Sequence, residues 1–255
     1  MSAASGEAGA PTSGALAIAG RLGAHVYDLR WRLLPPATGV AMIALLLGAL
    51  IVAPREVVEG EVQRLFYIHV PSALAFYMAF FVLFVASILV LWTRDMRFDS
   101  VARAAAGVGV LFTGLTLATG AIWGKPIWGV YWAWDARLTS TLVLFLIYSG
   151  YLLARSLGDR TDEQMARYAA VFAIVGFLDI PFIHFAVHWW RTLHPQPIVF
   201  RSDAALPGEM LAVLLVGIVA VGLLATWLIV LREEAESLAA GAEALRAEVD
   251  RVEGM

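Results

Sequence analysis

Residues 70–92 read VPSALAFYMAFFVLFVASILVLW and contain no Asp, Glu, Lys or Arg. A helix crosses a hydrocarbon core of about 30 Å with about 20 apolar residues, so this stretch is long enough to span a membrane. The whole chain has the same character, because 60% of its 255 residues are hydrophobic and only 15% are charged. A soluble domain has about 25% charged residues. The sequence therefore indicates a protein whose solvent is a lipid bilayer.

Five further segments are long and apolar enough to cross a bilayer, which predicts an all-α polytopic membrane protein with about six transmembrane helices. The predicted spans are 36–53, 70–92, 101–122, 138–155, 168–187 and 208–231. They divide the chain into a flexible N-terminal extension (1–35), a membrane domain (36–231) and a tail (232–255). The extension is mostly Ala, Gly and Ser, and it cannot bury enough apolar surface to fold alone.

The Lys and Arg residues predict the orientation of the spans, since cytoplasmic loops of membrane proteins carry more of them. With the N-terminus inside, the outer segments hold only Arg55, Arg64, Lys125, Arg137, Arg191 and Arg201 of the 18 Lys and Arg residues. Both termini are therefore predicted to be cytoplasmic. In either orientation, six spans place the first, third and fifth connections (54–69, 123–137 and 188–207) on one face.

Composition also excludes several classes of function. The chain has no cysteine, which excludes disulfides, thiolate metal ligands and thiol catalysis by this protein. The formal net charge is −3 and no basic stripe runs along the chain, so no nucleic acid is expected as a partner. The sequence has no phosphate-binding Gly-rich loop, so any ATP hydrolysis must belong to a partner.

The third connection is dense in tryptophan. It reads WGKPIWGVYWAWDARLT and contains Trp123, Trp128, Trp132 and Trp134. An aromatic belt at the membrane interface explains one or two Trp at a helix end, but not this density. Residues 123–140 are therefore predicted to form an outward loop that offers an apolar platform to a planar ligand. Asp135 and Arg137 would fix the loop or the polar edge of the ligand.

Two histidines from different spans are predicted to face this loop. His69 precedes Pro71, which suits the first turn of a helix, so His69 lies at the outer end of the second span. His184 lies at the outer end of the fifth span, and two imidazoles can bind a haem iron from opposite faces. A zinc site at His184 and His188 is an alternative, but the sequence offers no third ligand beside them. His194 is interpreted as a loop residue.

Cations on the outer side are candidate partners for the two propionates of a haem, because Arg and Lys pair with carboxylates. Arg64, Lys125 and Arg137 are the candidates in the first and third connections. Each could instead be an interfacial cation that extends toward water. Asp179 lies inside the fifth span, where an acid is costly and usually functional. Pro181 beside it frees a backbone group that Asp179 could satisfy instead.

At these residues the sequence resembles the haem exporter protein C (CcmC) family of bacterial cytochrome c maturation, one branch of the haem-handling proteins with a WWD domain. The resemblance rests on Trp123-Gly-Lys-Pro, Trp128-Gly-x-x-Trp132-x-Trp134-Asp135-Ala-Arg137-Leu-Thr-Ser140, Ile68-His69-Val-Pro71, and Ile183-His184 with Trp189-Trp190 and Thr192-Leu-His194. It covers about residues 36–230.

The resemblance implies a haem b at the periplasmic face of the bacterial inner membrane, held by the Trp-rich loop and by His69 and His184 as axial ligands. It implies delivery of that haem to a periplasmic haem chaperone (CcmE-like) for the biogenesis of c-type cytochromes. It also implies an ABC-type complex with an ATP-binding subunit (CcmA-like), a second membrane subunit (CcmB-like) and a small single-span protein (CcmD-like). The protein would then be a delivery subunit and not an enzyme.

Two other functions remain as alternatives. A cytochrome c synthetase (haem lyase) of the same superfamily is usually larger and would be expected to have a further histidine pair within its spans. A haem-containing membrane oxidoreductase subunit would need bis-histidine haems buried between helices, with histidines on the inner side of the spans. The spans of this sequence contain neither feature.

The tail has a heptad pattern of apolar residues, at Leu238, Ala242, Leu245, Val249 and Val252. This pattern predicts a cytoplasmic amphipathic helix that continues from the sixth span and packs on a cytoplasmic partner. A solvated extension that frays beyond Gly241 is the alternative, since three heptads make a marginal coiled coil.

Overall fold

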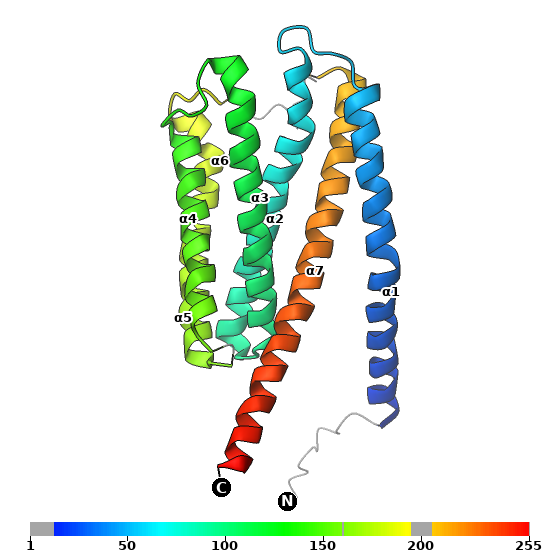
Figure 1. Cartoon of the computed structure of the whole chain (residues 1–255), viewed down its shortest axis with the longest axis vertical. Coiled ribbons are helices and arrows are strands. Elements are labelled where there is room, and N and C mark those ends of the chain that lie inside the picture. The colour runs from blue at the N-terminus through cyan, green and yellow to red at the C-terminus, as the bar shows by residue number, and fades with distance from the viewer. Residues whose placement is uncertain (1–12, 160, 195–205, 255) are drawn as a thin grey trace, which may run out of the picture.

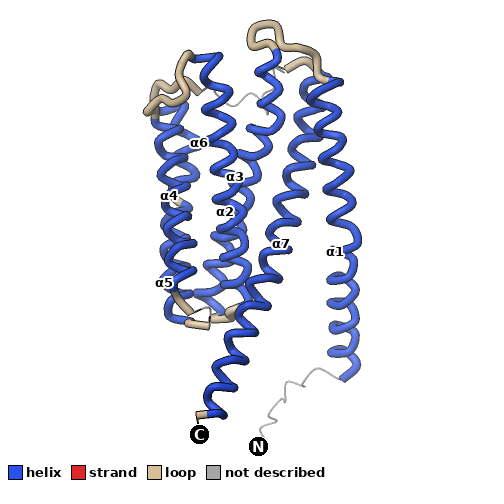
Figure 2. The backbone as a smooth tube through the Cα atoms, viewed as in Figure 1, coloured by secondary structure: helices blue, strands red, loops and turns tan. Residues whose placement is uncertain are grey.

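The computed structural model describes residues 13–159, 161–194 and 206–254, with side chains from Leu29 onward. Within these residues the structure contains helices and no strand, and six helical segments are long and apolar enough to cross a membrane (Figures 1 and 2). The predicted all-α fold with six spans is confirmed. Arg201, one of the outer cations, lies outside the described residues.

The elements in chain order are α1 (Ser13–Leu47), the π-helical turn η1 (Gly48–Val52), the 3₁₀ segment η2 (Glu61–Leu65), α2 (Phe66–Thr93), α3 (Arg97–Trp128), α4 (Ala136–Leu157), α5 (Glu163–Phe177), α6 (Asp179–Trp189) and α7 (Gly208–Glu253). Helices α1 and α7 pack along one flank, and α4 packs on α5 and α6 at the other (Figure 1). Helices α2 and α3 lie between the two flanks. The start of α1 and the end of α7 lie at the same end of the bundle.

Small residues allow the central helices to approach closely, as is common between membrane helices. Residues 104–106 of α3 are all Ala and are 0% exposed. A Cβ on Gly109 would come within 2.3 Å of Phe80 on α2, and a Cβ on Gly217 within 3.0 Å of the Tyr67 carbonyl oxygen. Helix α2 therefore packs closely on α3 near its middle and on α7 near its start.

Two ion pairs connect helices at the end of the bundle where α3 begins and α4 ends. Arg155 of α4 pairs with Asp99 of α3 at 2.6 Å, and their side chains are 1% and 5% exposed. Arg103 of α3 pairs with Glu236 of α7 at 3.0 Å. The second pair ties α7 to the bundle before its last turns project past the connection between α4 and α5 (Figure 1).

Helix α3 is longer than the predicted third span. It continues through Trp128 and ends where Gly129 adopts φ +77°, a left-handed conformation that glycine takes without strain. Pro126 is tolerated one turn before this end. The predicted loop 123–140 is therefore wrong at both ends, because α3 contains its beginning and α4 its last five residues. Only 129–135 is a loop.

The predicted fifth span consists of two helices, α5 and α6, which meet at Leu178. Pro181 has no N–H to donate to the carbonyl oxygen four residues earlier, so the α-helical hydrogen bonding is interrupted. The N–H of Leu178 instead donates to the Val175 carbonyl oxygen at 3.1 Å, the tighter 3₁₀ spacing. Asp179 then occupies the first turn of α6, where a carboxylate is favourable.

Both end helices are longer than predicted. Helix α1 begins at Ser13, so residues 13–35 are helical rather than irregular, in keeping with their Ala content and despite Pro35 and Pro36. Helix α7 continues through the tail to Glu253 rather than fraying beyond Gly241. The four large residues of the heptad pattern are 44% to 69% exposed. The packing of this pattern on a partner stays a prediction.

Candidate functional site

The informative residues gather at one end of the bundle, at the start of α2, the end of α3, the start of α4 and the segment that follows α6 (Figure 1). Six alternating spans require this, as the sequence predicted. The residues of this end come from three connections far apart in the chain.

His69 lies in the first turn of α2 and is 7% exposed. Its ring packs against α3, where a Cβ on Gly120 would come within 3.0 Å of His69 Cε1. His69 Nδ1 lies 3.0 Å from the Thr119 hydroxyl oxygen, and that hydroxyl donates its own hydrogen to the Leu115 carbonyl oxygen at 2.7 Å. The hydroxyl can then only accept from His69, so Nδ1 carries the proton and Nε2 keeps its lone pair.

Trp123 covers a second side of the His69 ring. The two ring centroids are 5.7 Å apart with an interplanar angle of 69°, and Phe66 contacts the indole from its other edge at 5.9 Å. The indole N–H donates to Glu59 Oε2 at 3.0 Å, which links the first connection to α3. Trp123 therefore lies at a fixed position on α3 beside His69, and it is not part of the loop that follows α3.

His194 is the second histidine that the structure brings to this place. Its ring centroid lies 6.3 Å from that of His69, with the two planes tilted by 32°. The Trp128 ring lies 6.3 Å from His194. The sequence interpretation missed this pairing because His194 lies beyond α6, where no helical periodicity predicts its position. Its place in the motif Thr192-Leu-His194 was the only available signal.

Asp135 and Arg137 hold His194 in position. Asp135 caps α4 by accepting from the Leu138 N–H at 2.8 Å, and its other oxygen accepts from the Leu193 N–H at 3.2 Å. Arg137 donates to His194 Nδ1 at 3.1 Å. Its two other nitrogens donate to the carbonyl oxygens of Ile183 at 3.2 Å and His184 at 3.0 Å. The predicted role of Asp135 and Arg137 in fixing loop geometry fits these contacts.

The ring of His184 is not brought to His69. His184 is exposed, and its ring contacts the edge of Phe185 at 5.1 Å. His188 is also exposed and lies 6.4 Å from Phe185. The carbonyl oxygen of His184 thus faces Arg137 while its side chain is exposed, and its role as an axial ligand stays a prediction. For the zinc alternative, no group of three or more His, Cys, Asp or Glu residues converges among the described residues.

The other predicted aromatic residues line the connection between α3 and α4. Trp132 and Trp134 pack edge to face at 5.6 Å, and Trp134 is 77% exposed. Lys125 donates to the Gly129 carbonyl oxygen at 2.8 Å and lies 5.2 Å from the centre of the Tyr131 ring. Lys125 therefore stabilises the end of α3.

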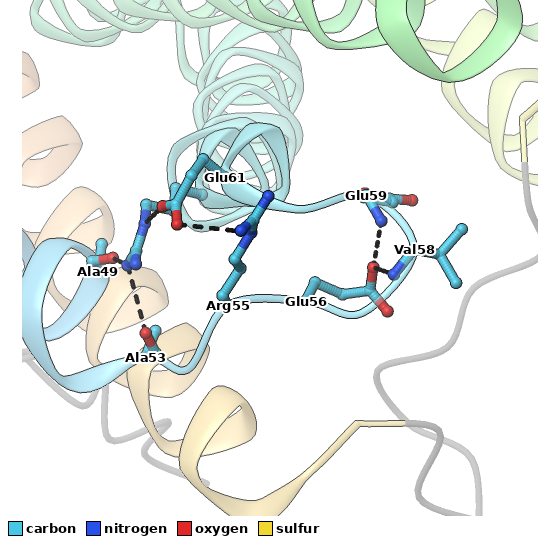
Figure 3. Close-up of polar contacts among 8 residues, drawn as sticks. Ala49, Ala53, Arg55, Glu56, Val58, Glu59 and Glu61 are labelled. Carbon is cyan, nitrogen blue, oxygen red and sulfur yellow. Dashed lines mark hydrogen bonds and ion pairs between the residues drawn. The ribbon is translucent and has the colours of Figure 1, made fainter.

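Arg64 is engaged by the first connection. Its guanidinium donates to the carbonyl oxygens of Ala49 and Ala53, the latter at 3.3 Å, and pairs with Glu61 at 2.6 Å. Figure 3 labels these three partners. These bonds satisfy carbonyl groups at the end of the first span. A contact between Arg64 and a haem propionate would compete with them and stays a prediction.

A comparison of the whole chain with known families tests the resemblance that the motifs indicated. A family profile described as "Heme exporter protein C" matches residues 21–248. The chain belongs to the haem exporter protein C family. The resemblance inferred from the Trp and His motifs is thereby confirmed, and the match extends beyond the region that the motifs covered.

Individual relatives agree with the family. The chain is 40% identical over 197 residues to "Heme exporter protein C" of Bradyrhizobium diazoefficiens, which covers 76% of this chain and 74% of the relative. It is 44% identical over 160 residues to a "Putative cytochrome c biosynthesis ccmC-like mitochondrial protein" of Marchantia polymorpha, covering 63% and 67% of the two chains. The Escherichia coli K12 "Heme exporter protein C" is 40% identical over 144 residues, 56% of this chain and 58% of the relative. The protein is thus a multi-pass membrane member of this family.

Proposed function

We propose that the protein binds haem b between His69 and His194 and delivers it to a haem chaperone for the biogenesis of c-type cytochromes. The observation that carries the proposal is the pair of imidazoles at the Trp-rich end, whose ring centroids lie 6.3 Å apart. The family supports haem as the cargo, and the sequence orientation supports the periplasm as the face of delivery.

The separation of the two rings suits one metal ion between them. With metal–nitrogen bonds of about 2 Å and ring centres about 1 Å behind each nitrogen, two opposed imidazoles have centroids about 6 Å apart. His69 and His194 have centroids 6.3 Å apart. For this reason the proposal takes His194 as the second ligand in place of the exposed His184.

The surroundings of His69 suit ligation. Metal-bound histidines usually donate their second ring N–H to a neighbouring acceptor, which fixes both the tautomer and the ring orientation. Thr119 is that acceptor for His69, at 3.0 Å from Nδ1. The Nε2 lone pair is left for iron, and Gly120 gives the ring the room to sit there.

The Trp side chains supply the apolar surroundings that a porphyrin requires. Trp123 and Trp128 contact the two histidines, each from α3. Trp132 and Trp134 extend the aromatic surface outward, and the exposed Trp134 is placed where a partner could contact it. Lys125 is the nearby cation for a propionate, and it would give up its present hydrogen bond to the Gly129 carbonyl oxygen to do so.

The partners follow from the same proposal. A haem chaperone takes the haem at the Trp-rich end. An ATP-binding subunit, a second membrane subunit and a small single-span protein complete an ABC-type complex in the bacterial inner membrane. The protein itself is a delivery subunit, and ATP hydrolysis belongs to its partner.

Optical spectra of four variants of the purified protein test the proposal. His69→Ala and His194→Ala should each lose the six-coordinate spectrum of bound haem and the yield of cytochrome c, because each removes one axial ligand. His188→Ala, the matched control on α6, should keep both. If His184→Ala lost the six-coordinate spectrum and His194→Ala kept it, the pair proposed here would be wrong and the sequence prediction right.

A further inference from the structure

We propose that Arg137 and haem iron compete for the same lone pair of His194, so that Arg137 sets the rate at which haem leaves. The inference rests on the proposed axial role of His194 and goes beyond it by naming the residue that opposes ligation. The observation is the contact of 3.1 Å between Arg137 Nη1 and His194 Nδ1.

The direction of this hydrogen bond is fixed by chemistry. A guanidinium has five N–H donors and no acceptor, so the nitrogen it approaches must accept. A neutral imidazole has one acceptor nitrogen and one N–H. While Arg137 donates to Nδ1, the proton of His194 is therefore on Nε2, and neither ring nitrogen offers a free lone pair to a metal.

Ligation by His194 must then break this bond by one of two routes. If iron binds Nδ1, it displaces Arg137 from the same lone pair. If iron binds Nε2, the proton on Nε2 moves through solvent to Nδ1, which then can no longer accept from Arg137. In both routes one iron–nitrogen bond forms, one N–H···N hydrogen bond is lost, and no electron is transferred.

The two histidines are therefore prepared differently. The hydroxyl of Thr119 accepts from His69 Nδ1 and leaves Nε2 available, whereas Arg137 occupies the acceptor of His194. His69 is expected to bind iron first and release it last. His194 is the ligand that is exchanged during delivery.

The contacts of Arg137 allow the exchange without a large movement. Its other two nitrogens donate to the carbonyl oxygens of Ile183 and His184, so the guanidinium stays anchored to α6 when His194 turns away. Asp135 accepts from the Leu193 N–H and keeps the backbone beside His194 in place. The donor and the iron thus compete for a ring that remains within reach of both.

The rate of haem loss measures the competition between Arg137 and iron for His194. The full-length protein is loaded with haem in detergent, and transfer to an excess of apomyoglobin is timed for wild type, Arg137→Ala, His194→Ala and the double variant. Loss of a hydrogen bond with one charged partner should slow haem loss by about 10- to 100-fold in Arg137→Ala. Arg55→Gln, which removes an exposed cation of the first connection at the same end, is the control and should leave the rate unchanged.

The double variant shows whether the effect of Arg137 passes through His194. In a His194→Ala background, Arg137→Ala should have no further effect on the rate. Faster haem loss in Arg137→Ala, loss of its six-coordinate spectrum, or an equal effect in both backgrounds would overturn the inference. If the haem spectrum of His194→Ala were the same as that of the wild type, the proposed axial pair would be wrong.

A second measurement needs no haem. ¹⁵N NMR of the histidine side chains in the haem-free protein should show His194 as the Nε2–H tautomer and His69 as the Nδ1–H tautomer. A wild-type His194 that already carries its proton on Nδ1 would overturn the competition.

Discussion

The two ends of the bundle use polar side chains in opposite ways. At the Trp-rich end, His69 Nδ1 lies 3.0 Å from the Thr119 hydroxyl oxygen and His194 Nδ1 lies 3.1 Å from Arg137 Nη1, and a ligand can leave such contacts in place or replace them. At the other end, the Arg155 and Asp99 side chains lie 2.6 Å apart and are both almost completely buried. On the proposed function, polar side chains bind haem at one end, whereas at the other end they hold helices together.

The energetic reason lies in desolvation. A buried ion pair loses its hydration on folding, and removing one partner leaves the other charge uncompensated. Imidazole is neutral when it binds a metal, so His69 can be buried against Thr119 without that penalty. The Trp-rich end can therefore combine burial with an available ligand.

The largest effect is expected from breaking the ion pair. Asp99→Ala leaves Arg155 buried without its carboxylate, which should lower the free energy of unfolding by about 3–5 kcal/mol. Thermal unfolding in detergent measures the change. Asp95→Ala, which removes a partner of the exposed Arg97, is the control and should change stability little. If the folded Asp99→Ala protein keeps a normal haem spectrum, the two ends of the bundle act independently. A lost haem spectrum would show that the ion pair also affects the haem site.

A smaller effect is expected from crowding His69. In Gly120→Ala the new Cβ would lie 3.0 Å from His69 Cε1, so the ring must shift at a cost of about 1–3 kcal/mol. Haem titration should show weaker binding, and thermal unfolding should show a loss of stability within that range. Gly150→Ala, whose Cβ would meet nothing within 4 Å, is the matched control. Equal affinities in the two variants would argue against His69 as a ligand.

The effect of removing a Trp side chain should depend on its position. Trp128→Ala removes a ring beside His194 and should weaken haem retention by up to about 10-fold, the worth of one aromatic contact. Trp134→Ala, on a ring that is 77% exposed, should leave retention unchanged and lower the transfer of haem to the chaperone. Haem retention and haem transfer are measured on the same preparations. If the exposed Trp134 ring held the haem, Trp134→Ala would lower retention more than Trp128→Ala.

No effect on haem is expected from the tail. Deleting residues 238–255 removes the exposed heptad pattern but keeps Glu236, which pairs with Arg103. The haem spectrum and the unfolding temperature should match wild type, because the deleted turns lie at the opposite end. A changed spectrum would show that the two ends are coupled.

The sequence predicted the parts of this fold that depend on apolar length, whereas positions that depend on tertiary contacts could not be predicted from it. Residues 70–92 could only be a span, and the alternation of six spans placed the Trp and His connections together. The pairing of His194 with His69 arises from Arg137 and Asp135, which contact residues about 57 positions away. No periodicity records such contacts, and helix position instead favoured His184.

The axial pair can be tested most directly by changing the ligand rather than removing it. His194→Met offers iron a thioether in place of an imidazole, and His/Met ligation raises the reduction potential of haem. The account predicts a higher potential for the bound haem in His194→Met and an unchanged potential in His184→Met. A potential that rises in His184→Met and stays constant in His194→Met would contradict it.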